Sequence, residues 1–109
     1  DEISPFEETN VVELKAGNIN GFKINPKDLG IKTGNRENLR GKNADYNAQK
    51  IIEIFKGISN EFSLTVALNV AAGMIVSGKE NSFKIAFENA QKHLSSGVVL
   101  NHLSKIQSI

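Results

Sequence analysis

The chain has 109 residues, the size of one small domain, and 13 Lys and Arg residues stand against 12 Asp and Glu residues. This balance provides neither the broad basic field that nucleic-acid binding requires nor an acidic tail, so we expect no nucleic-acid partner. The absence of cysteine excludes disulfides, thiolate catalysis and cysteine-ligated zinc. It also suits a reducing compartment such as the cytoplasm.

Residues 1–34 are predicted to form a loop and a β-hairpin. Residues 11–14 (VVEL) and 19–24 (INGFKI) have strand-forming composition, and Gly17 lies in the turn between them, where it can adopt a positive φ angle. A two-stranded hairpin is marginal by itself. The pattern therefore predicts that a larger sheet, or a helix, covers this hairpin.

A short helical turn is predicted next, capped by Asn25, started by Pro26 and ended by Gly30. Residues 35–42 are polar and have neither the strand nor the helix period, so they are predicted to be a loop. The loop is modestly basic, which is typical of a solvated segment. Arg40 is its strongest candidate for anion binding, because it precedes the start of a helix.

Residues 43–109 are predicted to be helical. Four helices are expected to begin near Asn43, Asn60, Ser82 and Val98. In the first helix, Ile51 and Phe55 fall on the expected apolar face, and Gly57 can end the helix. The third helix presents its apolar residues at helical spacing, namely Phe83, Ala86, Phe87, Ala90 and Leu94.

The second helix, residues 60–77, is apolar on almost every side, which predicts the buried centre of the chain. Its small residues Ala67, Ala71 and Gly73 would allow neighbouring helices to approach closely. The apolar stretch within it is interrupted by Ser63, Thr65 and Asn69, and it is shorter than the roughly 20 residues that a membrane span requires. We therefore expect no membrane partner.

Few residues offer catalytic chemistry. His93 and His102 are the only histidines, and we interpret them as a favourable charge near a helix C-terminus and a solvated side chain, respectively. The histidines and acids lack the tight spacing of a zinc site. No glycine-rich phosphate-binding motif occurs. Asp1 and Glu2 are adjacent carboxylates that could bind magnesium, but by themselves they are more typical of a charged terminus.

The order of motifs carries more information than any single residue. The chain reads DEIS, then the hairpin VVELKAGNINGFKINPKDLGI, then LRGKNADYNAQKIIEIFKG, LTVALNVAAGMIVSGK and a helix ending in SSG. This series resembles the C-terminal third of the anthranilate phosphoribosyltransferases over essentially all 109 residues. Two details depart from the family. Lys42 and Asn43 stand where glycine and aspartate are common, and residues 5–9 lack a glycine often found there.

The resemblance implies an α/β fold, with these residues forming the last part of the α/β domain of a nucleoside phosphorylase/phosphoribosyltransferase-like enzyme. It implies Mg²⁺ held by Asp1 and Glu2 in the intact enzyme, which would be a cytoplasmic homodimer acting on anthranilate and phosphoribosyl pyrophosphate. The substrate-binding residues would lie upstream, so the remainder of the enzyme is the expected partner and the segment alone should be inactive. Two alternatives stay open: a related pyrimidine nucleoside phosphorylase or paralogue, and a stand-alone helical binding module.

Overall fold

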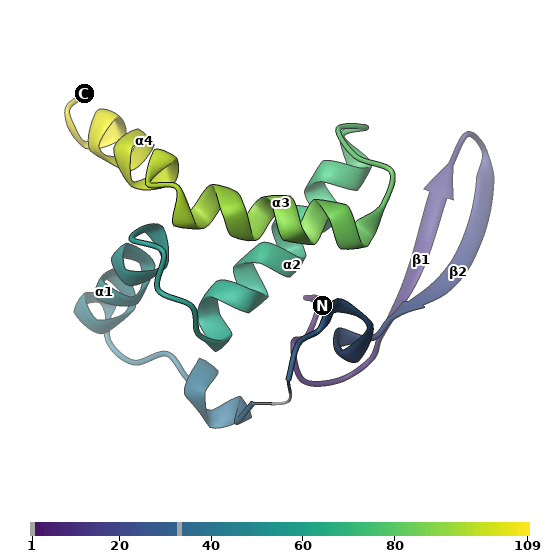
Figure 1. Ribbon diagram of the computed structural model, residues 1–109, viewed down its shortest axis with the longest axis horizontal. Helices are drawn as coiled ribbons and strands as arrows, with labels where there is room; N and C mark the ends of the chain where they lie inside the picture. The colour runs from purple at the N-terminus through teal and green to yellow at the C-terminus, as the bar shows by residue number, and fades with distance from the viewer. Residues whose placement is uncertain (1, 33) are drawn as a thin grey trace.

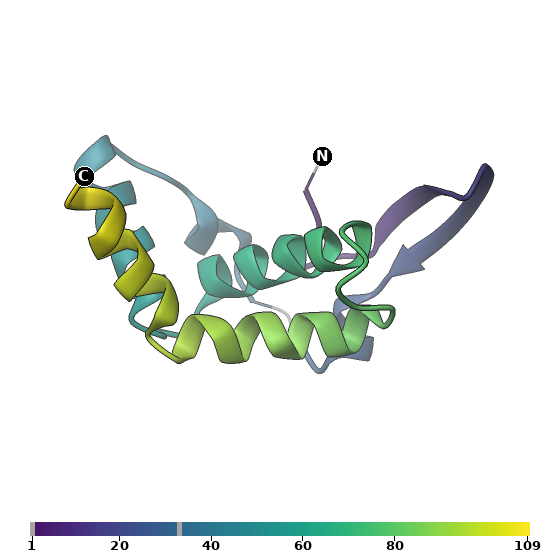
Figure 2. The ribbon, with the colours of Figure 1, turned by 90° about the horizontal axis from the view of Figure 1, so that it is seen from above.

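A computed structural model describes residues 2–32 and 34–109. A hairpin is followed by two short 3₁₀ helices and four α-helices. In chain order they are β1 (Thr9–Lys15), β2 (Asn18–Ile24), η1 (Pro26–Leu29), η2 (Arg36–Leu39), α1 (Ala44–Phe55), α2 (Glu61–Val76), α3 (Phe83–Ser95) and α4 (Val98–Gln107). The hairpin projects at one end of the molecule, α3 lies across α2, and α1 and α4 are at the other end (Figures 1 and 2). The expected hairpin and four helices are confirmed.

The strands pair antiparallel through a two-residue turn, and Lys15 lies opposite Asn18. Both turn residues have positive φ angles, 50° at Ala16 and 78° at Gly17. Such turns match the twist of the strands that they join. The sequence predicted a positive φ angle at Gly17 but not at Ala16, because an alanine side chain opposes the left-handed conformation that this turn requires.

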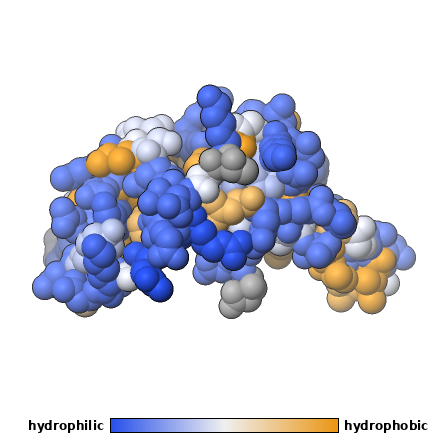
Figure 3. Space-filling view, turned by 90° about the horizontal axis from the view of Figure 1, so that it is seen from below, coloured by the Kyte–Doolittle hydropathy of each residue, from blue (hydrophilic) through white to orange (hydrophobic). Residues whose placement is uncertain are grey.

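The two faces of the hairpin differ in their surroundings. Ile24 is buried, and its strand partner Thr9 is half-buried. On the opposite face, Val12, Leu14 and Ile19 are 76%, 72% and 73% exposed. Figure 3 shows hydrophobic residues gathered at the hairpin end of the molecule. We call Val12, Leu14 and Ile19 the outer hairpin face; it leaves apolar side chains in water, where they are unfavourable.

Local caps explain where α1, α2 and α3 begin. The side chain of Asn43 accepts a hydrogen bond from the Tyr46 N–H at 2.9 Å and thereby caps the start of α1. Asn60 and Ser63 form a reciprocal capping box at the start of α2. Ser82 caps α3 through the Ile85 N–H. These starts agree with the sequence-based expectations.

The core lies mainly between α2 and α3. Its buried members are Ile31, Ile54, Ala67, Leu68, Ala71, Ala86, Phe87, Ala90 and Leu94. Alanines on both helices leave room for Leu68 and Phe87, the largest fully buried side chains. Helix α2 is therefore the hydrophobic centre, as predicted. The expected role of Gly73 was wrong, because a side chain at that position would meet open space rather than a neighbouring helix.

Helix α1 packs differently from the expectation. Ile54 is buried, whereas Ile51 is 47% exposed and Phe55 is half-buried. Periodicity alone places an apolar face but cannot identify which part of it a neighbouring helix covers. Gly57 ends the helix with a φ of 86°, and a Cβ there would lie 3.0 Å from the Cα of Ser95, so glycine also allows α1 and α3 to approach.

The predicted loop at residues 35–42 contains a short 3₁₀ helix, η2. Asn35 caps it by accepting a hydrogen bond from the Glu37 N–H. The side chain of Asn38 donates to Glu61 Oε1 at 2.7 Å and thereby attaches η2 to the start of α2. A single capped turn is too short to produce a detectable period, which explains why the sequence indicated only a loop.

The hydrogen bond between Asn38 and Glu61 leads to a prediction about the pKa of Glu61. The hydrogen bond from Asn38 lowers the pKa of Glu61 below its ordinary value of 4.5. Because the folded-state pKa is the lower one, the ionised carboxylate stabilises the fold above the unfolded-state pKa, and that contribution is lost as the pH falls through the folded-state pKa. Asn38→Ala should raise the pKa of Glu61, measured by NMR titration of its carboxyl carbon. Asn101→Ala, on exposed α4, should leave it unchanged; an unaltered pKa in Asn38→Ala would contradict the assignment.

None of the helices formed by the described residues combines the length and the hydropathy that crossing a bilayer would require.

Candidate functional site

The acidic start of the chain is attached to the centre of the molecule through Ile3. The Ile3 N–H donates to Asn69 Oδ1 at 3.1 Å, and Asn69 belongs to α2. Ile3 also packs against the core, and Pro5 is buried. The predicted ligand Glu2 is therefore next to a fixed residue, while the predicted ligand Asp1 lies outside the described residues.

Polar contacts also shape the loop that leads from this segment into β1. The Ser4 N–H donates to Thr9 Oγ1 at 3.2 Å, and the Phe6 N–H donates to Ser4 Oγ at 3.1 Å. Farther along the loop, Glu7 pairs with Arg36 at 2.6 Å on the surface. The missing family glycine therefore does not leave residues 5–9 without internal contacts.

Glu2 is exposed beside a shallow hollow of about 310 Å³ on α2. Thr65, Val66, Asn69 and Val70 form the rest of its lining. Within residues 2–32 and 34–109, no three His, Asp or Glu side chains gather to hold a metal ion. The described residues therefore do not form a metal cage by themselves. One or two carboxylates with space beside them do fit Mg²⁺, which keeps several waters and binds substrate phosphates.

The other candidate residues do not form a common site in the described part of the chain. His93 and His102 are exposed on α3 and α4, as the sequence indicated. Arg40 is exposed and lies 3.5 Å from Glu37, so it is part of a surface ion pair rather than a buried anion site. Tyr46 is half-buried.

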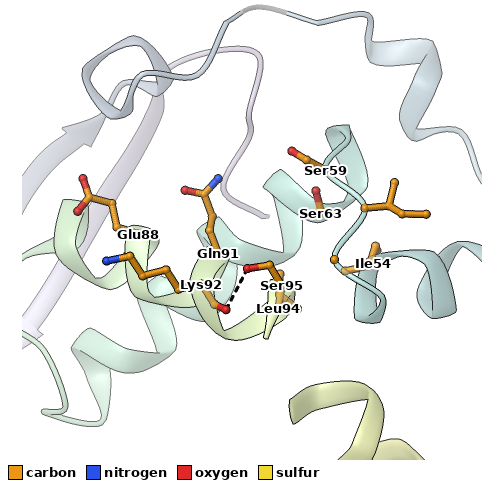
Figure 4. A pocket seen from close by; sticks show the side chains of 10 residues that line it. Ile54, Ser59, Ser63, Glu88, Gln91, Lys92, Leu94 and Ser95 are labelled. Atoms are coloured by element: carbon orange, nitrogen blue, oxygen red, sulfur yellow. Dashed lines mark hydrogen bonds between the residues drawn. The ribbon is translucent and has the colours of Figure 1, made fainter. Parts of the chain in front are cut away.

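A second hollow, of about 360 Å³, lies between α3 and the connection from α1 to α2 (Figure 4). Its lining includes Ser59 and Ser63 on one side and Glu88 and Lys92 on the other. A serine nucleophile would require a base within reach. In the described part of the chain, both histidines lie outside this lining, so the hollow does not present a nucleophile–base arrangement.

A family model described as "Glycosyl transferase family, a/b domain" matches residues 1–100. The chain belongs to this glycosyl transferase family. The match includes residues 1–4, which we call the acidic segment, the hairpin and the helices through the start of α4. The fold is consistent with part of the α/β domain of a phosphoribosyltransferase.

Sequence relatives of this glycosyl transferase domain agree with the resemblance. The anthranilate phosphoribosyltransferase of Pelagibacter ubique (strain HTCC1062) is 48% identical over 109 residues, which is 100% of this chain and 33% of the relative. That of Idiomarina loihiensis (strain ATCC BAA-735 / DSM 15497 / L2-TR) is 34% identical over 108 residues, covering 98% of this chain and 32% of the relative. The chain thus spans about a third of the length of these curated relatives.

The same relationship appears in three dimensions. The crystal structure of anthranilate phosphoribosyltransferase (TrpD) from Thermus thermophilus superposes on this glycosyl transferase domain with a TM-score of 0.85 and 29% sequence identity. The superposition covers 96% of this chain and 31% of the Thermus chain. The resemblance drawn from the sequence is therefore confirmed.

Asn69 is the residue that sequence reasoning missed. It was noted as a polar interruption of an apolar helix and as part of a stretch that carries the family resemblance, but no role was assigned to it. That interruption was the available signal, because an asparagine in such a helix lowers helix propensity and needs hydrogen-bond partners. Its partner Ile3 lies 66 positions away in the sequence, and local patterns carry no information about that contact.

Proposed function

We propose that these 109 residues form the C-terminal part of an anthranilate phosphoribosyltransferase of tryptophan biosynthesis. The intact enzyme would transfer the phosphoribosyl group of phosphoribosyl pyrophosphate to the amine of anthranilate. We expect it to be a magnesium-dependent cytoplasmic homodimer, as the resemblance implies. The supporting observation is that relatives with this name match the whole chain with about a third of their length.

The exposed surface of these residues is larger than that of a self-contained domain, which favours the interpretation that they are part of a larger protein. The structure exposes 7585 Å², whereas a folded monomer of this mass exposes about 6,000 Å². The excess is about twice the roughly 800 Å² that one partner contributes to a standard protein interface. The radius of gyration is 15.0 Å, against about 13 Å for a compact domain near this length.

Two apolar surfaces contribute to this excess. One is the outer hairpin face, and the other is an open stripe of α2 that contains Val70, Gly73 and Val76. A stand-alone binding module would bury such residues or use them for a partner. We propose that the upstream part of the enzyme covers both surfaces. The stand-alone module is disfavoured by the family match over residues 1–100. The phosphorylase alternative is disfavoured by the names of the sequence relatives, which are anthranilate phosphoribosyltransferases.

The proposed reaction requires no acid or base from this segment. Anthranilate nitrogen attacks the anomeric carbon while pyrophosphate departs, so negative charge grows on the leaving group. Mg²⁺, when bound, would neutralise part of that charge. Asp1 and Glu2 would hold the ion through their carboxylates, and the folded loop behind Glu2 would fix where they are presented.

The test is reconstitution. The upstream two-thirds of the Pelagibacter relative would be joined to residues 1–109 of this chain, and consumption of anthranilate fluorescence would be followed with phosphoribosyl pyrophosphate and Mg²⁺. We expect this chimera to turn over substrate. The 109-residue chain alone and the upstream part alone should not, because catalysis requires both reactants to be positioned together.

The Pelagibacter enzyme with its own C-terminal third serves as the positive control. A chimera that folds, as judged by circular dichroism and gel filtration, but shows no turnover would contradict the proposed function. Turnover by the 109-residue chain alone would contradict the claim that the substrate sites lie upstream.

A further inference from the structure

We infer that Asn69 is a positioning residue that sets the acidic segment in place for the magnesium–pyrophosphate complex. The inference rests on the proposed function for its ligand, but its structural part stands on hydrogen bonds within the described chain. Asn69 lies in the middle of α2 and reaches the segment that carries Glu2. It would not touch substrate or metal; it would act through the backbone of Ile3.

The amide of Asn69 contacts both backbone polar groups of Ile3 rather than one of them. Its Oδ1 accepts from the Ile3 N–H at 3.1 Å, and its Nδ2 donates to the Ile3 carbonyl at 3.4 Å. The shorter bond provides most of the attachment, since 3.4 Å is beyond the usual range for N–H···O bonds. Both bonds together fix the direction in which the chain runs past α2.

A third hydrogen bond orients the amide itself. Asn69 Nδ2 also donates to the Thr65 carbonyl, one helical turn back, at 2.9 Å. That carbonyl can only accept, so the nitrogen must face Thr65 and the oxygen must face the Ile3 N–H. The side chain is thus locked at both ends, which is the arrangement that a rigid support requires.

Helix propensity does not favour asparagine at this position. Asparagine has lower helix propensity than leucine or alanine. Its neighbours Leu68 and Val70 are apolar, and an apolar residue would maintain the pattern of the helix. The polar side chain instead uses its amide groups to hold a segment that lies 66 positions away in the sequence.

Fixing Ile3 has a direct consequence for Glu2. Its carboxylate is one residue upstream of a backbone that is already ordered, so ion binding needs to order little besides the side chain. The exposed Glu2 is also kept beside the hollow on α2 rather than at the end of a loose strand. Pre-ordering of this kind raises affinity without adding any contact to the ligand.

The experiment compares Asn69→Leu with Thr65→Val. Leucine has a similar shape but cannot form the hydrogen bonds. Thr65 is on the same side of α2 and lines the same hollow, and its hydroxyl donates within the helix, to the Glu61 carbonyl at 2.8 Å. Valine retains the backbone carbonyl that accepts from Asn69. The control therefore perturbs α2 locally while leaving the attachment of Ile3 intact.

The first readout is amide hydrogen exchange of Ile3 in the 109-residue chain. The second is the affinity of the chimera for Mn²⁺ in the presence of pyrophosphate, measured by electron paramagnetic resonance. In Asn69→Leu we expect faster exchange at Ile3 and an affinity about tenfold lower, the lower end of the range for groups that orient metal ligands. In turnover assays the Mg²⁺ concentration for half-maximal rate should rise by a similar factor, with the rate at saturating Mg²⁺ nearly unchanged. Thr65→Val should change none of these.

The outcomes separate the two proposals. The role of Asn69 would be overturned, even if the chimera is active, by either of two results. One is fast amide exchange at Ile3 in the unsubstituted 109-residue chain, and the other is equal Mn²⁺ affinity in the chimeras with and without Asn69→Leu. An equal loss of Mn²⁺ affinity in Thr65→Val would also overturn it, because any disturbance of α2 would then be enough to weaken metal binding. An inactive chimera with intact Ile3 protection and an Asn69-dependent Mn²⁺ affinity would overturn the proposed reaction but not the positioning role.

Discussion

Leu68→Ala should lower the free energy of unfolding by about 2–5 kcal/mol, the range for truncating a buried leucine. Leu68 is 0% exposed and lies in the core between α2 and α3, where the neighbouring buried alanines cannot extend to fill the space that the substitution would leave. Because small domains are stable by only about 5–15 kcal/mol, this single change would remove a large share of the total.

Chemical denaturation of the 109-residue chain, followed by circular dichroism, measures the effect. Val76→Ala is the matched control: it removes apolar atoms from the same helix at a position that is 86% exposed, and it should change stability by less than about 0.5 kcal/mol. Equal losses for the two variants would show that α2 is not the centre of the core.

The double substitution of Asp1→Asn and Glu2→Gln should weaken magnesium–pyrophosphate binding to the chimera by about 100-fold or more. Each carboxylate that binds the ion or its waters contributes a charge-assisted interaction of about 1.5–3 kcal/mol. The 109-residue chain should bind Mg²⁺ poorly with or without the double substitution. Magnesium gives up water reluctantly, and two carboxylates without substrate phosphates provide too few ligands for tight binding.

Isothermal titration calorimetry can compare both proteins. Asp28→Asn combined with Glu88→Gln is the control, since it changes the net charge equally at exposed positions outside the acidic segment. Unimpaired binding in the double variant of the chimera would show that the acidic pair is only a charged segment of the surface. Tight binding of Mg²⁺ to the isolated chain would show that the site does not need substrate phosphates.

The sequence predicted the elements well where the determinants are local. Asn43, Asn60 and Ser82 begin helices because their side chains accept hydrogen bonds from N–H groups only three positions away. The hairpin turn was located for the same reason, since Gly17 marks it. Residue type and immediate neighbours are sufficient for such features.

Features that depend on distant parts of the chain could not be predicted in this way. The burial of Ile54 rather than Ile51 depends on where α2 and α3 pass, and the role of Asn69 depends on the return of Ile3 to α2. The candidate metal site was proposed from a family resemblance, not from spacing, because two adjacent acids have no distinctive pattern. It stays a prediction for Asp1 and Glu2.

The outer hairpin face has a consequence for how this part of the protein can evolve. A side chain in water can change without affecting other positions, whereas one that is covered by another segment constrains the residues that cover it. If the upstream part covers Val12, Leu14 and Ile19, substitutions at these positions should be correlated with substitutions upstream in an alignment of full-length relatives. Exposed residues of α4, such as Asn101 and His102, should then vary independently of the upstream sequence. Pairwise covariation among full-length sequences could therefore identify the segment that lies on the hairpin.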